Sequence, residues 1–223
     1  MPDGPLSLPA RLYLLAWDTN TTEVTGAAGL PHLVRAGALT ELAQRGLLVD
    51  EDGIATPADM DSLTGDAALD GLLELVRESR PHRWRTWVTL HARVTLDAVR
   101  EQLTAEGYLR AQKKRVLGVF PSVEHVLAQA AVVDALREEA RQVLEGPVSV
   151  ADVSGRDAAV VALAAAAELR TLVPGKDRKR HHARVAELTE RSGAAAPALR
   201  KIVTEVQTAV TASLTAAAVA TGD

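Results

Sequence analysis

The sequence contains no cysteine and few aromatic residues. Without cysteine it can form neither a disulfide nor a thiolate metal site, a pattern that fits a reducing compartment. With one phenylalanine, two tyrosines and three tryptophans, the core must consist mainly of alanine, leucine and valine. Such a core favours closely packed helices over a sheet sandwich, which is richer in β-branched and aromatic residues. Composition therefore predicts a mainly α protein.

Long apolar runs are also lacking. A membrane-crossing helix needs roughly 20 apolar residues, and the nearest candidate, 206–220, is interrupted by Gln207 and by several threonines and a serine. Residues 1–10 show neither the basic start nor the apolar run of a signal peptide. We therefore expect a soluble, cytoplasmic protein.

Recognisable catalytic and metal-binding motifs are absent from the sequence. It has no glycine-rich phosphate loop, no His-Glu-x-x-His and no Gly-x-Ser-x-Gly. His181 and His182 are adjacent, so on a helix they would point about 100° apart and could not hold one metal together. We expect both at the surface. The sequence thus predicts no enzymatic activity, no cofactor and no metal site.

A helix, a glycine and two short strands occur twice in succession. In the first copy, 33–57, apolar residues recur every three or four positions up to Gly46, and an acidic turn at 50–53 then separates two strands. The second copy, 96–121, aligns Gly107 with Gly46 but has a basic turn. Glycine lacks a Cβ and therefore suits a left-handed helix terminator at both positions. Two short β-hairpins are predicted.

Helical patterns occupy most of the remaining chain. Segment 158–173 is apolar nearly all round, which is typical of a helix inside a bundle. We expect a single domain, residues 1–223, built on a helical bundle with surrounding helices and the two short β-hairpins. Besides 158–173 and the two repeated units, helices are expected over 6–17 (with a strand as the alternative), 67–79, 122–144, from 176 to a loop at 192–197, and 198–220, with an irregular connection at 18–29.

Charge is segregated along the chain, although the net charge is only −4. Residues 1–76 carry three basic and twelve acidic side chains, whereas residues 77–115 carry ten basic and four acidic ones, a net charge of +6. This block predicts a positive face suited to anionic lipid or nucleic acid, unless folding interleaves the blocks. Within it, Trp84 and Trp87 stand among arginines, either as core residues or at a boundary between water and lipid.

Two binding functions fit these features. One is a peripheral protein whose positive face recognises phosphorylated lipid headgroups. The other is a winged-helix DNA-binding protein with Lys113, Lys114 and Arg115 on its wing, but the acidic turn of the first unit would repel DNA phosphates, which makes nucleic acid an unfavoured partner. A soluble protein–protein interaction scaffold is the remaining alternative.

Four stretches of the chain form a recognisable series. They are Glu-Leu-Ala-Gln-Arg-Gly at 41–46, Thr-Gly-Asp at 64–66 with Leu69 and Asp70, Val-Arg-Glu at 99–101 with Leu103, Gly107 and Leu109, and the alanine-rich segment 157–169. In their order and spacing they resemble the Golgi phosphoprotein 3 family (GPP34 domain). The short, alanine-rich form is similar to bacterial members from actinobacteria, and the likeness runs from about residue 6 to the C-terminus.

This resemblance implies a helical, non-enzymatic protein that binds phosphatidylinositol 4-phosphate as a peripheral membrane protein on the inner face of the membrane. In the family a tryptophan and three arginines form the headgroup site. Arg35 and Arg100 match two of the arginines, whereas Asp97 stands in place of the third. Gly26 occupies the aromatic position, for which Trp17 is a candidate substitute.

These departures predict a partly degraded headgroup site. A phosphate contact from arginine contributes about 1.5–3 kcal/mol, and a carboxylate in its place adds repulsion. We therefore expect weak binding of anionic lipid through Arg35, Arg93 and Arg100. A scaffold that has lost lipid binding is the alternative.

The resemblance also implies self-association. In the family a hairpin joins copies of the protein, and it corresponds here to residues 112–120. Apolar side chains at its edge support a homo-oligomer. They are those of Val116, Leu117, Val119 and Phe120.

Overall fold

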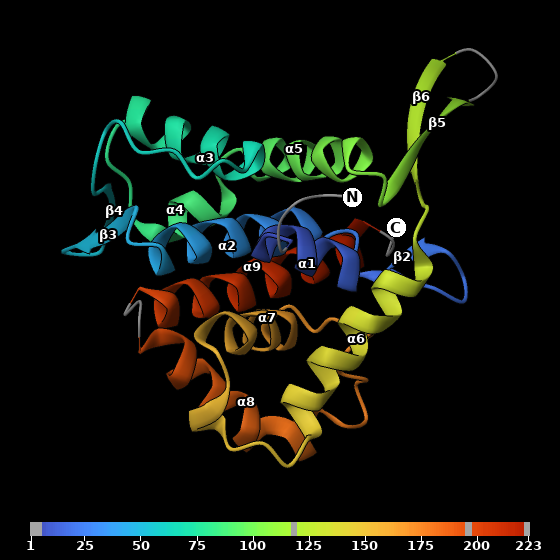
Figure 1. Ribbon diagram of the computed structural model, residues 1–223. Helices are drawn as coiled ribbons and strands as arrows, with labels where there is room; N and C mark the ends of the chain where they lie inside the picture. The colour runs from blue at the N-terminus through green and yellow to red at the C-terminus, as the bar shows by residue number, and fades with distance from the viewer. Residues whose placement is uncertain (1–5, 117–119, 195–197, 221–223) are drawn as a thin grey trace.

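The fold is mainly helical, as predicted (Figure 1). The computed structural model describes residues 6–116, 120–194 and 198–220, without the side chains of 114–116, 120–122, 210 and 213–220. The helices are α1 (Leu8–Leu15), α2 (Leu30–Gln44), α3 (Ala67–Glu78), α4 (Trp84–Thr89), α5 (Ala92–Ala105), α6 (Ala130–Glu145), α7 (Gly155–Ala166), α8 (Arg178–Gly193) and α9 (Leu199–Ala220), with a 3-10 turn at Val150–Asp152. The antiparallel strand pairs are β1 (Trp17–Asp18) with β2 (Glu23–Val24), β3 (Leu48–Glu51) with β4 (Ile54–Pro57), and β5 (Leu109–Val116) with β6 (Phe120–Leu127).

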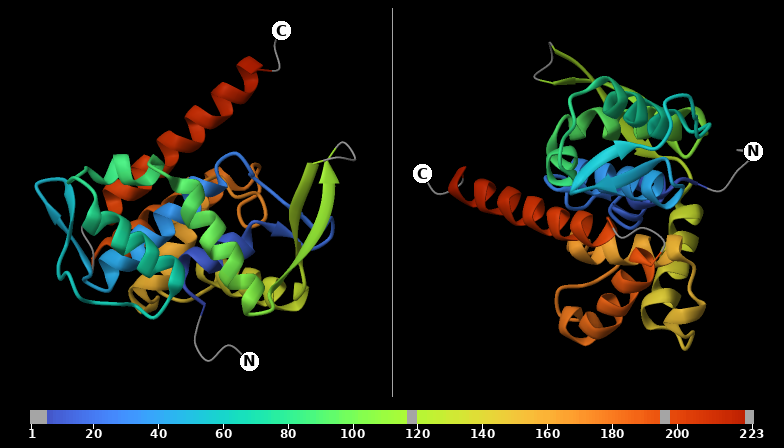
Figure 2. Two further views of the ribbon diagram at one scale, coloured as in Figure 1. Left: turned by 90° about the horizontal axis from the view of Figure 1, so that it is seen from above. Right: turned by 90° about the vertical axis from the view of Figure 1, so that its left-hand side faces the viewer.

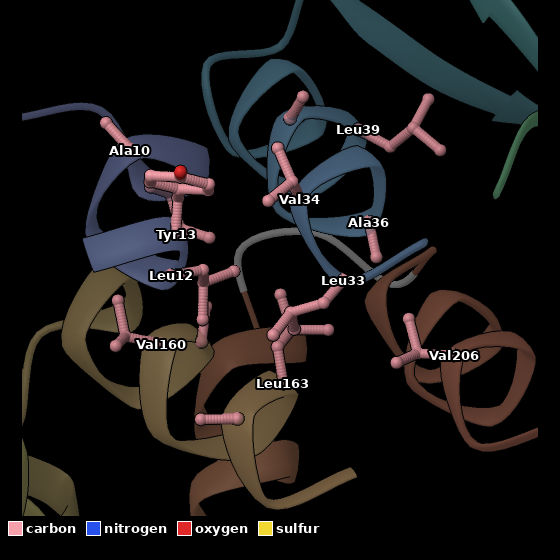
Figure 3. Packing of buried hydrophobic residues seen from close by; sticks show 14 of the residues in the cluster. Ala10, Leu12, Tyr13, Leu33, Val34, Ala36, Leu39, Val160, Leu163 and Val206 are labelled. Atoms are coloured by element: carbon pink, nitrogen blue, oxygen red, sulfur yellow. The ribbon is translucent and has the colours of Figure 1, made fainter. Parts of the chain in front are cut away.

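Helix α2 lies at the centre of the molecule and is buried on nearly every side. Helices α1, α3, α4, α5, α7 and α9 all contact it. Figure 3 shows Leu12 of α1, Leu163 of α7 and Val206 of α9 gathered around Leu33 of α2. A helix surrounded in this way buries its polar residues along with its apolar ones, which an apolar stripe in the sequence does not reveal.

Helix α1 packs against α2 at close range over Gly37. A Cβ added to Gly37 would lie 2.7 Å from Cδ1 of Leu12 and 3.2 Å from the Cα of Pro9. Both distances are shorter than ordinary van der Waals contact. The absence of a side chain at Gly37 is therefore what lets the two helices approach.

Both helix–glycine–hairpin units are confirmed. The glycines that follow α2 and α5 have positive φ, +71° at Gly46 and +81° at Gly107. In the first hairpin, Leu48 pairs with Pro57 and Glu51 with Ile54. The second hairpin is longer, with eight paired positions on each strand. Figure 1 shows the two hairpins at opposite ends of the molecule.

Three predicted boundaries are wrong. The helix expected at 122–144 begins only at Ala130, because residues 120–127 form a strand that pairs with β5. Helix α7 ends at Ala166 instead of residue 173, since Glu168 takes a left-handed conformation with φ of 52°. Segment 18–29, expected to be irregular, contains part of the small β1–β2 pair.

Helix α9 joins the last part of the chain to the first hairpin. Near its start, Lys201 donates a hydrogen bond of 2.6 Å to Asp50 of β3, 151 residues away. The residues that pack on the body include Leu199, Ile202 and Val206, all buried, and the C-terminal part projects beyond the other helices (Figure 2). None of the helices in the described ranges is long and apolar enough to cross a membrane.

Candidate functional site

Arg35 of α2 is fully buried. Its Nη2 donates a hydrogen bond of 2.6 Å to the carbonyl oxygen of His91, whereas Nε and Nη1 have no partner among the described residues. Burial lowers the pKa of Arg35 to about 10, because the charged form loses its hydration. A buried cation without a counter-charge is unfavourable, so an anion that reached this guanidinium would be bound strongly.

The carbonyl that contacts Arg35 belongs to the turn between α4 and α5. His91 precedes α5 in a left-handed conformation, with φ of 52° and ψ of 31°. Its side chain is exposed on the outside of the turn. Next to it, Arg93 is also exposed and forms no ion pair within the described part of the chain. The turn at the start of α5 therefore lies between buried Arg35 of α2, which contacts its backbone, and exposed Arg93 of α5.

The two tryptophans before this turn are core residues. Trp84 and Trp87 are both buried, and Nε1 of Trp84 donates a hydrogen bond of 2.6 Å to Asp50. Arg85, between them, is exposed and pairs with Glu205 of α9 at 3.3 Å. Of the two interpretations of this segment, the structure favours a buried anchor over a membrane-facing aromatic surface.

Arg100 lies farther along α5 and is held against α1. Its Nε donates a hydrogen bond of 3.3 Å to the hydroxyl of Tyr13, and the centre of its guanidinium lies 5.6 Å from the Tyr13 ring centroid. On the solvent side, Nη1 lies 3.3 Å from Oδ1 of Asp97. The carboxylate of Asp97 thus partly neutralises Arg100.

Trp17 is a core residue and not a surface ring. Its side chain is only 3% exposed and meets Tyr13 edge-to-face with 6.4 Å between ring centroids. Gly26 has φ of +66° and nothing within 4 Å of the position where a Cβ would stand. Neither position presents an aromatic ring to a headgroup, although Trp17 supports the tyrosine that holds Arg100.

The predicted arginines are only partly brought together. Arg35 contacts the turn at the start of α5, where Arg93 is also located. Arg100 is nine residues beyond His91, about 13 Å along the helix axis at 1.5 Å per residue. Within the described structure, Arg35 and Arg100 share no hydrogen-bond partner.

The Glu-Leu-Ala-Gln-Arg-Gly segment holds other elements in place. Buried Glu41 accepts a hydrogen bond of 2.6 Å from the backbone N–H of Leu8 at the start of α1. Arg45 and Arg156 both contact the same carboxylate. Gln44 donates to the carbonyl of Gly155 at 3.0 Å and so anchors α7. This motif is a structural junction of three helices.

The Thr-Gly-Asp stretch has a similar structural role. Asp66 accepts from the backbone N–H of Leu69 at 3.0 Å and caps α3. Asp70 accepts from the backbone and the hydroxyl of Thr64, each at 2.6 Å. Gln102 of α5 donates to Asp66 at 2.9 Å. The stretch therefore fixes the first turn of α3 against α5.

The sequence model of Golgi phosphoprotein 3 (GPP34) matches residues 8–206, from α1 into α9. The chain belongs to the Golgi phosphoprotein 3 family. None of the curated proteins matches it. Because the matched region runs from α1 into α9, family membership accounts for the helical framework of this Golgi phosphoprotein 3-like chain.

Two of the hairpin residues assigned to self-association, Val116 and Phe120, lie at the paired ends of β5 and β6. Leu117 and Val119 lie outside the described residues. Val116 and Phe120 pair with each other in the backbone register that closes the hairpin. Among described neighbours, Arg110 and Lys113 of β5 are exposed. Self-association of this Golgi phosphoprotein 3-like chain thus stays a prediction.

Three histidines show what the sequence did and did not reveal. His32 lies one turn before Arg35, with a buried Nδ1 that has no partner in the described structure, and burial lowers its pKa. In the sequence, only the spacing of three residues between His32 and Arg35 indicated that the two side chains would share a face of the helix. Nothing in the sequence marked His91. His181, expected at the surface, is buried instead, with Nε2 3.4 Å from Glu145 of α6.

Cavities occur elsewhere on the molecule. One of about 320 Å³ lies between α6 and the start of α7, one of about 520 Å³ between α8 and α9, and one of about 470 Å³ beside the loop at 21–29. None of these three includes Arg35, Arg93 or Arg100 in its wall. No cluster of three or more metal-ligating side chains occurs in the described ranges.

Proposed function

We propose that this Golgi phosphoprotein 3-like chain is a non-enzymatic, peripheral membrane protein that associates in the cytoplasm with anionic phospholipid or phosphoinositide headgroups on the inner face of the membrane. The observation that carries the proposal is Arg35, a buried guanidinium that has two unpaired nitrogens and no carboxylate partner among the described residues. The exposed, unpaired Arg93 lies beside the turn that Arg35 contacts.

The basic block keeps part of its charge on the surface. Arg85 and Arg100 are paired with carboxylates, which reduces the positive potential near them. Each unpaired cation near an anionic bilayer contributes about 1 kcal/mol, an attraction that salt screens. Weak, salt-dependent association is therefore the expected behaviour. The exposed cations of the block without an ion pair in the described structure are Arg80, Arg83, Arg93, Arg110 and Lys113.

Vesicle co-sedimentation tests the proposal. We expect recovery at low salt with vesicles of phosphatidylcholine and phosphatidylglycerol, or of phosphatidylcholine and phosphatidylinositol 4-phosphate, but not with phosphatidylcholine alone. Losing two phosphate contacts in Arg93→Ala/Arg100→Ala should lower the affinity by at least tenfold, on the order of 1.4 kcal/mol or more. The control is Arg141→Ala on α6, an exposed arginine away from α5. Equal recovery with neutral and anionic vesicles would contradict the proposal.

A protein–protein scaffold is the second candidate function. It is favoured by the contact between Asp97 and Arg100 and by the burial of Trp17, which together remove much of a family-type headgroup site. Under this alternative, no vesicle composition recovers the chain, and affinity purification yields one partner at a fixed stoichiometry.

We further propose that the β5–β6 hairpin joins copies of the chain into a homo-oligomer. The support is the length of the hairpin, which extends from the helical body as a two-stranded ribbon (Figure 1). Light scattering at high protein concentration should give a mass above 23.6 kDa, and replacing residues 112–124 by a short turn should reduce it to that of the monomer. A monomeric mass for the unaltered chain would overturn this assignment.

A further inference from the structure

We propose that the turn between α4 and α5, residues 90–92, is a gate that covers Arg35 in the resting protein and opens to admit a phosphate group. The inference rests on the proposed function, because the phosphate of a lipid headgroup is the anion expected to enter. It adds a regulated step to that function, since the resting protein does not present Arg35 to a membrane.

The first reason is that Arg35 is in an incomplete environment. Its guanidinium is shielded from solvent, yet only Nη2 has a hydrogen-bond partner. A phosphate group offers several acceptor oxygens and a full negative charge, which is what the unpaired Nε and Nη1 lack. In the closed form Nε and Nη1 of Arg35 therefore lack the hydrogen bonds that an entering anion would accept from them.

The second reason is that the turn covering Arg35 consists of few residues. The carbonyl of His91 contacts Arg35 on the inside, while the His91 side chain is exposed on the outside. One turn of backbone therefore separates the guanidinium from solvent. Moving Leu90 and His91 outward would uncover Arg35, while the rest of α5 and the other five helices that contact α2 stay packed on it.

The third reason is the conformation of the cover. His91 has φ of 52°, in the left-handed region that residues with a side chain rarely adopt. Its hydrogen bond from Arg35 helps to hold it there. The same His91 carbonyl also accepts from the backbone N–H of Val94 at 3.0 Å. If a phosphate takes over Arg35, that local bond is left to hold the turn, and His91 can relax to a more favourable conformation. An anion that prefers the open form shifts the population towards it.

The position of α5 adds a further contact for the anion. His91 is the N-cap of this 14-residue helix and provides no side-chain cap. Unpaired amides at a helix N-terminus bind phosphate readily. Once the turn has moved, the first amides of α5, buried Arg35 and exposed Arg93 would lie around one phosphate.

Two substitutions at His91 separate the gate from a merely structural turn. His91→Gly suits the left-handed conformation and should stabilise the closed form, lowering the affinity for phosphatidylcholine–phosphatidylglycerol vesicles by about fivefold or more. His91→Val disfavours that conformation and should raise the affinity. The control is Thr22→Gly, at another left-handed residue in the β1–β2 turn, which should leave the affinity unchanged.

Labelling of arginine by phenylglyoxal, followed by peptide mass spectrometry, reports the gate directly and without lipid. Arg35 should react much more slowly than Arg141 in the unaltered chain, faster in His91→Val and more slowly still in His91→Gly. An unchanged, low rate at Arg137, whose side chain on α6 is largely buried, shows that each variant is folded. Equal rates at Arg35 and Arg141 in the unaltered chain, or His91 variants that shift the Arg35 rate in the same direction, would overturn the gate.

The two measurements keep the gate and the membrane function distinguishable. If the Arg35 labelling rates follow the prediction but no vesicle is bound, the gate stands and the membrane function fails. If anionic vesicles are bound but neither His91 variant changes labelling or affinity, the membrane function stands and the gate fails. Protection of Arg35 in His91→Val by inorganic phosphate alone would identify free phosphate as a sufficient ligand, whereas protection only by anionic vesicles would identify the headgroup.

Discussion

Oδ1 of Asp97 lies 3.3 Å from Nη1 of Arg100, one turn away on the same face of α5. Arg100 is fixed from the other side by Tyr13, so its guanidinium remains next to the carboxylate. An anion that approached Arg100 would have to compete with Asp97. This pair therefore sets an upper limit on how strongly α5 attracts phosphate.

Removing that carboxylate should strengthen membrane binding. In Asp97→Asn the side chain stays polar, but Arg100 loses its internal counter-charge. Because exposed pairs of this kind contribute up to about 1 kcal/mol, we expect a two- to fivefold gain in affinity for anionic vesicles at low salt. Glu101→Gln, also exposed on α5, changes the net charge equally. Equal gains in both variants would show that only the net charge matters.

The contact between α1 and α2 predicts opposite effects of alanine at two helical glycines. Gly37→Ala would force a Cβ against Leu12 and the backbone of Pro9, so the free energy of unfolding should fall by about 1–3 kcal/mol. At Gly71 of α3 nothing lies within 4 Å of the new Cβ. Gly71→Ala should therefore raise the free energy of unfolding by about 0.5–1 kcal/mol. Urea unfolding checks both values. A stable Gly37→Ala would mean that α1 can move away from α2 at little cost.

The buried carboxylate of Glu41 should be important for stability. Glu41→Gln cannot pair with Arg45 and Arg156 or accept as strongly from Leu8, so two cations lose their partner. We expect a loss of about 2–4 kcal/mol in urea unfolding. Glu74→Gln at an exposed position of α3 should change the free energy of unfolding by less than about 0.5 kcal/mol. A near-neutral Glu41→Gln would argue against a structural role for this motif.

Acidification should destabilise the protein partly through His32. Burial lowers the pKa of His32 below its ordinary value of 6.5, so the folded protein binds this proton less readily than the unfolded chain. The stability contributed by neutral His32 is complete above pH 6.5 and is lost as the pH falls towards the folded pKa.

The free energy of unfolding should therefore decrease more steeply between pH 7 and pH 5 in the unaltered chain than in His32→Gln. Burial also lowers the pKa of His125, which leaves some dependence in the variant. His182→Gln on the surface of α8 is the control. Parallel pH profiles for the unaltered chain and His32→Gln would contradict the prediction.

Local chemistry predicted the repeated units well. A glycine after an apolar helical stripe specified the left-handed residues at Gly46 and Gly107, and Asp66 specified the start of α3. Each of these signals depends only on residues within about four positions along the sequence. The length of the second hairpin was missed for the same reason: Ser122 looks like a helix cap locally, and only pairing with Lys114 across the ladder makes it part of a strand.

The candidate site was less predictable, because burial depends on packing among many elements. The pattern around Arg35 identified a helix, but not that six other helices surround it. The family resemblance marked Arg35 and Arg100 without showing that one is enclosed and the other held by Tyr13. The turn at His91 has no sequence signature, since its left-handed conformation is imposed by the elements on either side.

The wrapping of α2 by both ends of the chain has a consequence for biosynthesis. Helix α2 ends at Gln44 and α9 begins at Leu199, so about 155 residues separate the synthesis of the two helices. Until α9 is synthesised, the side of α2 that it contacts has no cover. The nascent chain therefore exposes an apolar surface of α2 through most of its translation. We expect a chaperone that holds unfinished chains to bind there.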